Sequence, residues 1–155
     1  MRKIITAPNK VLHQKGRLIE IPEEVDFIRE LRRDMNKILR QNKALGLTAC
    51  QIGIPANFFI VNKLKLSGTK KFNYFINTTI EYIGTPVAGE EGCLSIPGEL
   101  YTVERHSKIR VRSMMLNGTT RESVFSGLTA RVIQHEYDHT RGILISDIGD
   151  FKERT

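Results

Sequence analysis

Hydrophobic residues in the first third of the chain recur at the spacing of a helix. Positions three or four apart are apolar at Val25, Ile28, Leu31, Met35 and Ile38. This spacing places them on one face of an α-helix. Pro22 stands just before the run and suits the first turn of a helix, where its missing N–H would have no partner. The pattern predicts an amphipathic helix that follows Pro22.

The middle of the chain changes to the pattern of strands. Residues 57–62 and 72–83 are rich in β-branched and aromatic side chains, which favour strands. Residues 108–112 alternate between charged and apolar, as in a strand with one exposed face. The pair Asn117-Gly118 is typical of a hairpin turn and predicts a returning strand at residues 122–125.

The helical period returns near the end of the chain. One predicted helical face carries Leu128, Val132, His135 and His139. Ser126 is a suitable N-cap for this helix, and Gly142 is a suitable stop. Residues 143–145 are apolar and predict a last strand, which a short polar tail follows.

The order of these elements is helix, several short strands, helix and strand. It is typical of an α+β fold with mostly antiparallel sheets. A chain of 155 residues has the size of a single domain, here residues 1–155. Its 40% hydrophobic and 26% charged residues form an ordinary globular balance, which excludes fibrous and largely disordered proteins.

The composition also bears on location. No apolar run approaches the ~20 residues of a membrane span, and the apolar stretch at the start is too short for a signal peptide. The two cysteines, Cys50 and Cys93, are too few for a disulfide-dense secreted scaffold. We therefore expect a cytoplasmic protein with no membrane partner.

The chain carries a formal net charge of +7. A basic surface favours anionic partners, nucleic acid among them, although a positive surface also serves solubility alone. On the first predicted helix a basic stripe, named so from here on, is formed by Arg29, Arg33, Lys37 and Arg40. No nucleic-acid-binding motif accompanies the charge, so charge alone does not decide the function.

The second predicted helix contains an HExxH motif at residues 135–139. Residues four apart lie on one side of a helix, so His135 and His139 can bind one metal ion. Glu136 lies one residue round the helix, where it suits a general base acting on metal-bound water. The alternative is a pair of half-buried histidines on an apolar face, but such polar groups need a partner and a metal supplies one.

A catalytic metal site of this kind needs a third protein ligand and one open position. Cys93 is the best candidate, because a thiol near a divalent cation ionises and becomes a strong ligand. Taken alone, a cysteine is more commonly a small buried residue than a ligand. The remaining candidates are His13, His106 and Cys50. In the Gly-rich segment 46–53, the amide of Gln51 could donate to a developing oxyanion.

Three segments together resemble the peptide deformylase family, which carries GxGLAAxQ, EGCLS and a Gln-preceded HExxH in this order. They are ALGLTACQ at residues 44–51, EGCLS at 91–95 and QHEYDH at 134–139. The second and third match fully. In the first, Ala44 replaces a glycine and Thr48 replaces an alanine.

The resemblance implies the family's α+β fold, with antiparallel sheets around a central HExxH helix. It implies hydrolysis of the formyl group from N-formylmethionyl peptides and nascent chains, with release of formate. One divalent metal ion would be held by Cys93, His135 and His139. The family's usual ion is Fe²⁺, and Zn²⁺, Ni²⁺ or Co²⁺ can replace it.

The resemblance also assigns further roles. Glu136 would act as general base and acid, and the oxyanion would meet the Gln51 amide and the Leu94 N–H. The substrate pocket would include Leu45, Gly46, Glu91, Arg131 and Val132. At the position of Arg131 the family usually has an apolar residue, and an unpaired cation is not buried there without a large cost. We therefore expect its methylenes along the pocket wall and its guanidinium at the rim. The alternative is that the side chain turns wholly to solvent or to a nearby acid.

Two other functions remain open at this point. One is a zinc endopeptidase that uses HExxH with a different third ligand. The other is a basic RNA-binding module with a structural metal, which would need four protein ligands. For a deformylase we expect a formylated nascent chain as partner and a monomer. The basic stripe is either a solvated face or a weak contact to the ribosome, and both interpretations stay open.

Overall fold

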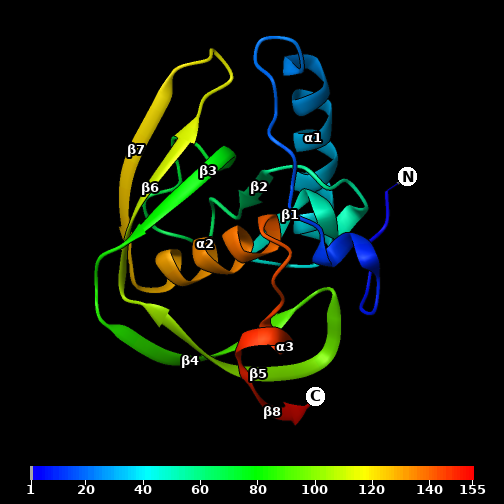
Figure 1. Cartoon of the computed structure of the whole chain (residues 1–155), viewed down its shortest axis with the longest axis vertical. Helices are drawn as coiled ribbons and strands as arrows, with labels where there is room; N and C mark the ends of the chain where they lie inside the picture. The colour runs from blue at the N-terminus through cyan, green and yellow to red at the C-terminus, as the bar shows by residue number, and fades with distance from the viewer. Residues whose placement is uncertain (1) are drawn as a thin grey trace.

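The computed structural model describes residues 2–155. Two antiparallel sheets lie on either side of one long helix, α2 (Gly127–Thr140), which crosses the centre of the molecule in Figure 1. The second long helix, α1 (Val25–Gln41), packs beside the larger sheet. This arrangement confirms the predicted α+β fold with antiparallel sheets around the HExxH helix.

The larger sheet has five strands in the order β1-β2-β3-β6-β7. Their bounds are Gly46–Thr48, Phe58–Val61, Tyr74–Tyr82, Lys108–Met114 and Thr120–Ser126. Every residue of β2 is buried, whereas β6 alternates between exposed and buried as the sequence predicts. The hairpin at Asn117-Gly118 is confirmed, with Gly118 in the left-handed region at φ 86°.

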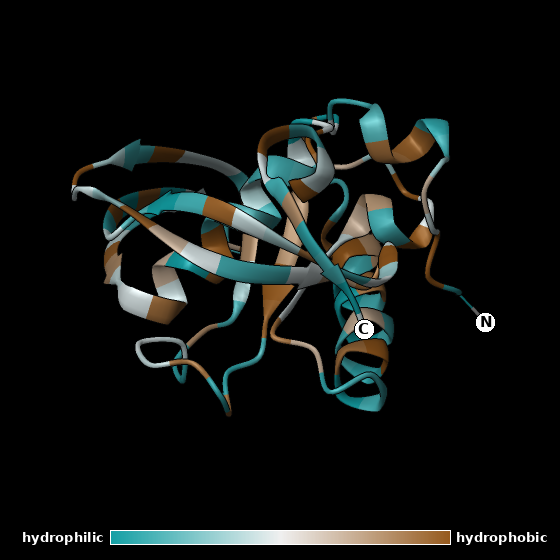
Figure 2. Ribbon diagram, turned by 90° about the horizontal axis from the view of Figure 1, so that it is seen from below, coloured by the Kyte–Doolittle hydropathy of each residue, from teal (hydrophilic) through white to brown (hydrophobic). Residues whose placement is uncertain are grey.

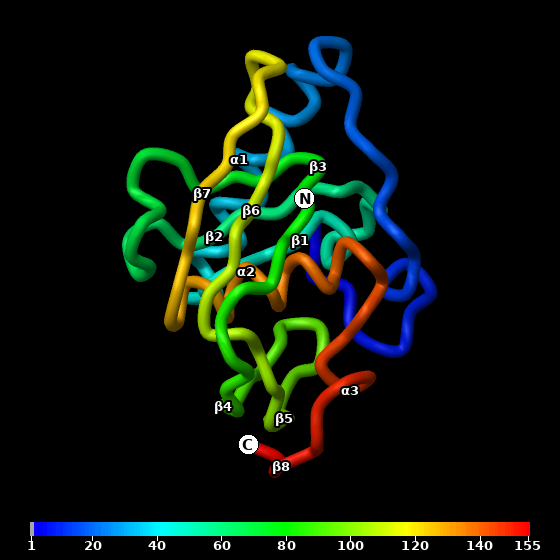
Figure 3. Tube along the Cα trace, turned by 60° about the vertical axis from the view of Figure 1, so that its left-hand side comes forward, coloured from blue at the N-terminus to red at the C-terminus, as the bar shows by residue number. Residues whose placement is uncertain are grey.

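The smaller sheet has three strands in the order β4-β5-β8. Their bounds are Pro86–Cys93, Ile96–His106 and Asp150–Arg154. Strand β8 lies at the sheet edge beside β5, close to the C-terminus in Figure 3. All its residues are exposed, and Figure 2 draws the segment that runs to the C-terminus as hydrophilic.

The predicted last strand at residues 143–145 is wrong. A short helix, α3 (Ile145–Ile148), begins there instead. The reason is local, because a carboxylate oxygen of Asp147 accepts a hydrogen bond from the backbone N–H of Leu144 at 2.8 Å and closes a helical turn. The short polar tail contains the strand β8.

Helix α1 confirms the predicted N-terminal helix but begins at Val25, so Pro22 lies in the turn before it. Its buried face consists of Ile28, Leu31, Met35, Ile38 and Leu39. The four side chains of the basic stripe are exposed. Among the helices of residues 2–155, none is both long and apolar enough to cross a membrane.

Helix α2 is buried on most sides, so its polar residues need partners inside the protein. Gln134 joins it to β5, because its side chain accepts from the His106 N–H and donates to the His106 carbonyl. Ser126 occupies the N-cap position but makes no side-chain capping bond. Gly142 follows the helix at φ 77°, and a Cβ there would lie 2.5 Å from the carbonyl oxygen of His13. Short 3₁₀ helices at Lys10–His13 and Ala49–Ile52 complete the regular structure.

Candidate metal centre and active site

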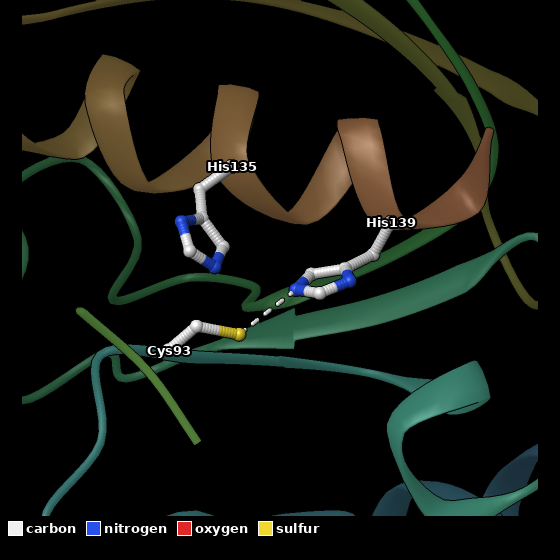
Figure 4. A group of neighbouring side chains, drawn as sticks. All are labelled: Cys93, His135 and His139. Carbon is white, nitrogen blue, oxygen red and sulfur yellow. Dashed lines mark hydrogen bonds between the residues drawn. The ribbon is translucent and has the colours of Figure 1, made fainter. Parts of the chain in front are cut away.

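The three predicted metal ligands lie together. His135 and His139 project from α2 towards Cys93, which ends β4 (Figure 4). Their ligand atoms all lie within 4.8 Å of one another, and Cys93 Sγ is 3.4 Å from His139 Nε2. Within residues 2–155, none of the alternative third ligands, His13, His106 and Cys50, belongs to this group.

The charges around the group suit a cation. Burial by itself lowers the pKa of His135, but Glu136, Cys93 and Glu91 outweigh burial and hold that pKa well above its ordinary value. Surroundings that favour a proton on the ring also favour a metal ion beside it. Burial, helped by His135, holds the pKa of His139 well below its ordinary value, so His139 is a neutral imidazole ready to ligate. The thiol and two imidazoles are a donor set that fits a divalent transition metal.

A buried ion-pair network holds the ring of His135. Glu91 Oε1 accepts from His135 Nδ1 at 2.8 Å, and the guanidinium of Arg105 donates to both oxygens of Glu91 at 2.9 Å. Arg105 also pairs with Asp138 on α2. Burial raises the pKa of Glu91, but the bonds from His135 and Arg105 prevail and lower it to about 2. Glu91 therefore remains ionised and orients the ring of the candidate ligand His135.

Glu136 lies beside the metal group without belonging to it. Its side chain is buried, and burial raises the pKa of the carboxyl. Thr48 Oγ1 donates to Glu136 Oε1 at 2.9 Å. On the other side, a Cβ on Gly46 would lie only 2.6 Å from Glu136 Oε2, so only glycine leaves room for the carboxylate.

Gln51 reaches the same centre from the second 3₁₀ helix. Its Nε2 lies 3.6 Å from Cys93 Sγ and 3.2 Å from Ser95 Oγ. Its Oε1 accepts from the backbone N–H of Thr48 at 3.0 Å, which turns the amide NH₂ towards Cys93. Leu94, the other predicted oxyanion donor, is half-buried directly after Cys93.

A cavity of about 730 Å³ opens at this centre. The five residues predicted for the substrate pocket all border it: Leu45, Gly46, Glu91, Arg131 and Val132. It is also bordered by Gln51, Cys93, Leu94, His135 and Glu136. The candidate ligands, the base and the oxyanion donors therefore border one open cavity, except His139, which does not border it.

Arg131 turns to an acid rather than to solvent. Its guanidinium donates to Glu91 Oε2 at 2.8 Å, to the Val103 carbonyl at 3.0 Å and to the Val87 carbonyl at 2.6 Å. It lies against Gly89, where a Cβ would be 2.8 Å from Cζ. The cation is thus neutralised inside the wall of the cavity.

Sequence reasoning missed three residues of this site. Arg105 gave no signal, because it is 14 residues from Glu91 in the chain and pairs with Val87, not with Glu91, in the β4–β5 register. Ser95 lay inside the EGCLS segment without an assigned role. Thr48 had a signal, since it departs from the alanine of the family motif.

The fold and this centre define a hydrolase of the HExxH type, with a cysteine as the candidate third metal ligand. The chain belongs to the polypeptide deformylase family, whose family model, described as "Polypeptide deformylase", matches residues 1–154. This confirms the resemblance found in the sequence.

Comparison with individual proteins supports the same family. The chain is 38% identical over 149 residues to a peptide deformylase of Afipia carboxidovorans, covering 95% of this chain and 85% of the relative. It is 34% identical over 139 residues to peptide deformylase 1 of Clostridium perfringens, covering 90% and 91%.

Solved structures show the same relationship. A class I type b peptide deformylase from Acinetobacter baumannii superposes with a TM-score of 0.86 at 28% identity, covering 94% of this chain and 96% of that one. A peptide deformylase from Synechococcus elongatus in complex with actinonin gives 0.86 at 31% identity, covering 96% and 79%. A probable peptide deformylase from Synechococcus phage S-SSM7 gives 0.84 at 30%, covering 96% and 99%. The chain is therefore a hydrolase, and deformylase activity is favoured over the zinc endopeptidase and RNA-binding alternatives.

Proposed function

We propose that Cys93, His135, His139, Glu136 and Gln51 carry out the removal of the formyl group from N-formylmethionyl peptides. The observation that supports this assignment is the position of Glu136. Its buried carboxylate borders the cavity beside three metal-ligand residues, and the Gln51 amide approaches the same cavity from another element.

When bound, a divalent ion on Cys93, His135 and His139 supplies Lewis acidity and lowers the pKa of a water molecule. Glu136 accepts a proton from the attacking water and later gives it to the leaving amine. Burial raises the pKa of Glu136 towards the range in which a carboxyl both takes and releases a proton. The Nε2 of Gln51 and the backbone N–H of Leu94 donate to the oxyanion that forms on the formyl oxygen.

We propose Fe²⁺ as the ion in the cell, with Zn²⁺, Ni²⁺ or Co²⁺ as substitutes. A thiolate and two imidazoles suit each of these ions, and intrinsic affinity does not favour iron. The choice of iron follows from the family resemblance and from availability in the cell, not from a difference in the ligands.

The partner we propose is a formylated nascent chain, which places the protein in protein biosynthesis. The methionine side chain would enter the cavity beside Leu45 and Val132, the apolar members of the predicted pocket. One chain supplies every residue of the site, which supports a monomer. Both cysteines are free, and a thiolate ligand requires reducing conditions, which supports a cytoplasmic location.

The experiment compares three peptides: formyl-Met-Ala-Ser, unformylated Met-Ala-Ser and a longer unformylated peptide with internal bonds. Products are identified by formate assay and mass spectrometry. We expect formate from the first peptide alone and no cleavage of internal bonds. Internal cleavage without formate release would restore the endopeptidase interpretation.

A further inference from the structure

Thr48 ends strand β1, and its side chain is completely buried under helix α2. Its hydroxyl donates to Glu136 Oε1 at 2.9 Å and lies 3.1 Å from the Glu136 carbonyl oxygen. Its backbone N–H donates to Gln51 Oε1 at 3.0 Å. One residue thus contacts both the proposed general base and the proposed oxyanion donor.

The bond to Glu136 distinguishes the two carboxylate oxygens. Oε1 is occupied by the Thr48 hydroxyl, whereas Oε2 lies beside Gly46 at the cavity. A carboxylate in a buried site without such a partner could rotate about its last bond, because that torsion is broad. The hydroxyl therefore selects which oxygen is presented to a reacting water.

The bond from the Thr48 backbone N–H fixes the orientation of the Gln51 amide in a similar way. An amide side chain has similar shape in its two flipped orientations, and its hydrogen bonds decide between them. With Oε1 held by the Thr48 N–H, the NH₂ group points towards Cys93 and Ser95. The donor is thereby presented to the metal centre.

We infer that Thr48 is a positioning residue for deformylation, which orients Glu136 through its hydroxyl and Gln51 through its backbone. The inference rests on the proposed roles of Glu136 and Gln51. The hydroxyl is the part that distinguishes this chain from the alanine of the family motif, and a side-chain substitution can remove it without touching the backbone bond.

The test uses Thr48→Val, which keeps the shape and removes the hydroxyl, and Thr48→Ser, which keeps the hydroxyl. We expect Thr48→Val to lower kcat about tenfold, the size of a lost hydrogen bond to a charged group, at unchanged KM and with about one metal per chain. Thr48→Ser should restore kcat to within about twofold of wild type. In a Glu136→Gln background, Thr48→Val should add no further loss.

The matched control is Thr129→Val, which removes another buried hydroxyl of the α2 region, bonded to the Ser67 carbonyl at 3.0 Å. It should leave kcat and KM unchanged. A purely structural role for Thr48 predicts instead that Thr48→Val lowers metal content, raises KM or is not rescued by serine. Any of these results, or an unchanged kcat, would overturn the inference.

Crystal structures of wild type, Thr48→Val and Thr48→Ser give a readout without activity. We expect one Glu136 carboxylate orientation in wild type and in the serine variant, and a rotated or divided one in the valine variant. If the wild-type protein releases no formate, the proposed function is refuted, and the carboxylate orientation alone then tests the inference about Thr48. If Glu136 has the same orientation in all three crystals, the inference about Thr48 is overturned.

Discussion

The carboxylate of Glu136 lies beside the three candidate metal ligands but does not belong to their group. Glu136→Gln should therefore keep about one metal ion per chain while kcat falls by at least ~10², because the general base is lost. Metal analysis and steady-state rates on the same sample check the retained metal and the reduced kcat. A metal-free variant would instead make Glu136 a ligand or a folding determinant.

Alanine substitutions at the two cysteines should have very different effects on metal binding and activity. Cys93→Ala removes a ligand residue, so we expect tight metal binding and formate release to disappear together. Cys50→Ala should leave both nearly intact, because Cys50 is buried and its thiol stays protonated, burial raising its pKa to about 12. Metal content and activity are measured for both variants. Loss of metal and activity in Cys50→Ala but not in Cys93→Ala would contradict the ligand assignment.

Single residues were predictable where their partners are close in sequence. The spacing of His135 and His139 fixes both on one helical face. The Arg105 partner of Glu91 was not predictable, since the two are 14 residues apart and are not opposite each other even in the β4–β5 pairing. The sequence does not fix the orientation of Arg131, because sequence alone does not show which carbonyls and acids face a helix.

At the scale of helices and strands, Arg131 links α2 to β4 and β5. It does so through the Glu91 carboxylate and the carbonyls of Val87 and Val103. Its side chain is 16% exposed. We expect Arg131→Leu to lower the free energy of unfolding by about 1–3 kcal/mol, since buried partners lose a charged donor. Urea denaturation measures this. Arg110→Leu, which breaks an exposed pair with Glu81, should cost about 0–1 kcal/mol.

The same contacts argue against a role for Arg131 in attracting substrate. Because Glu91 neutralises the guanidinium, the kcat/KM ratio of formyl-Met-Ala-Asp to formyl-Met-Ala-Lys should be equal in wild type and Arg131→Leu. A lower ratio in the leucine variant would show that the cation reaches the peptide.

Elements with a clear apolar period were predicted well, and those held by backbone pairing were not. Helix α1, helix α2 and the hairpin of β6 and β7 follow their patterns. Strand β8 is polar except for Phe151 and has no apolar alternation, and it forms because its backbone pairs with β5. The apolar residues 143–145 have the composition of a strand, but the Asp147 side chain turns them into a helix start.

At the scale of the whole molecule, the basic stripe on α1 is the surface we connect with ribosomal RNA. Contacts to phosphates weaken as salt rises, because binding releases counterions. We expect the protein to co-sediment weakly with ribosomes at low salt, and glutamate at Arg29, Arg33, Lys37 and Arg40 to remove most of this binding.

The control changes the net charge equally at another place. Glutamate at Lys63, Lys65, Lys70 and Lys71, all exposed in the loop between β2 and β3, should have a smaller effect. Equal losses in both variants would show that only net charge matters, and unchanged sedimentation of the α1 variant would remove the ribosome contact.

The central claim is that one metal ion on Cys93, His135 and His139 makes this chain a deformylase. The most direct measurement follows formate release from formyl-Met-Ala-Ser while Fe²⁺, under anaerobic conditions, is titrated into chelator-treated protein. The account predicts no release without metal, and a linear rise that ends at one equivalent per chain. Full formate release by protein shown to contain no metal would contradict it.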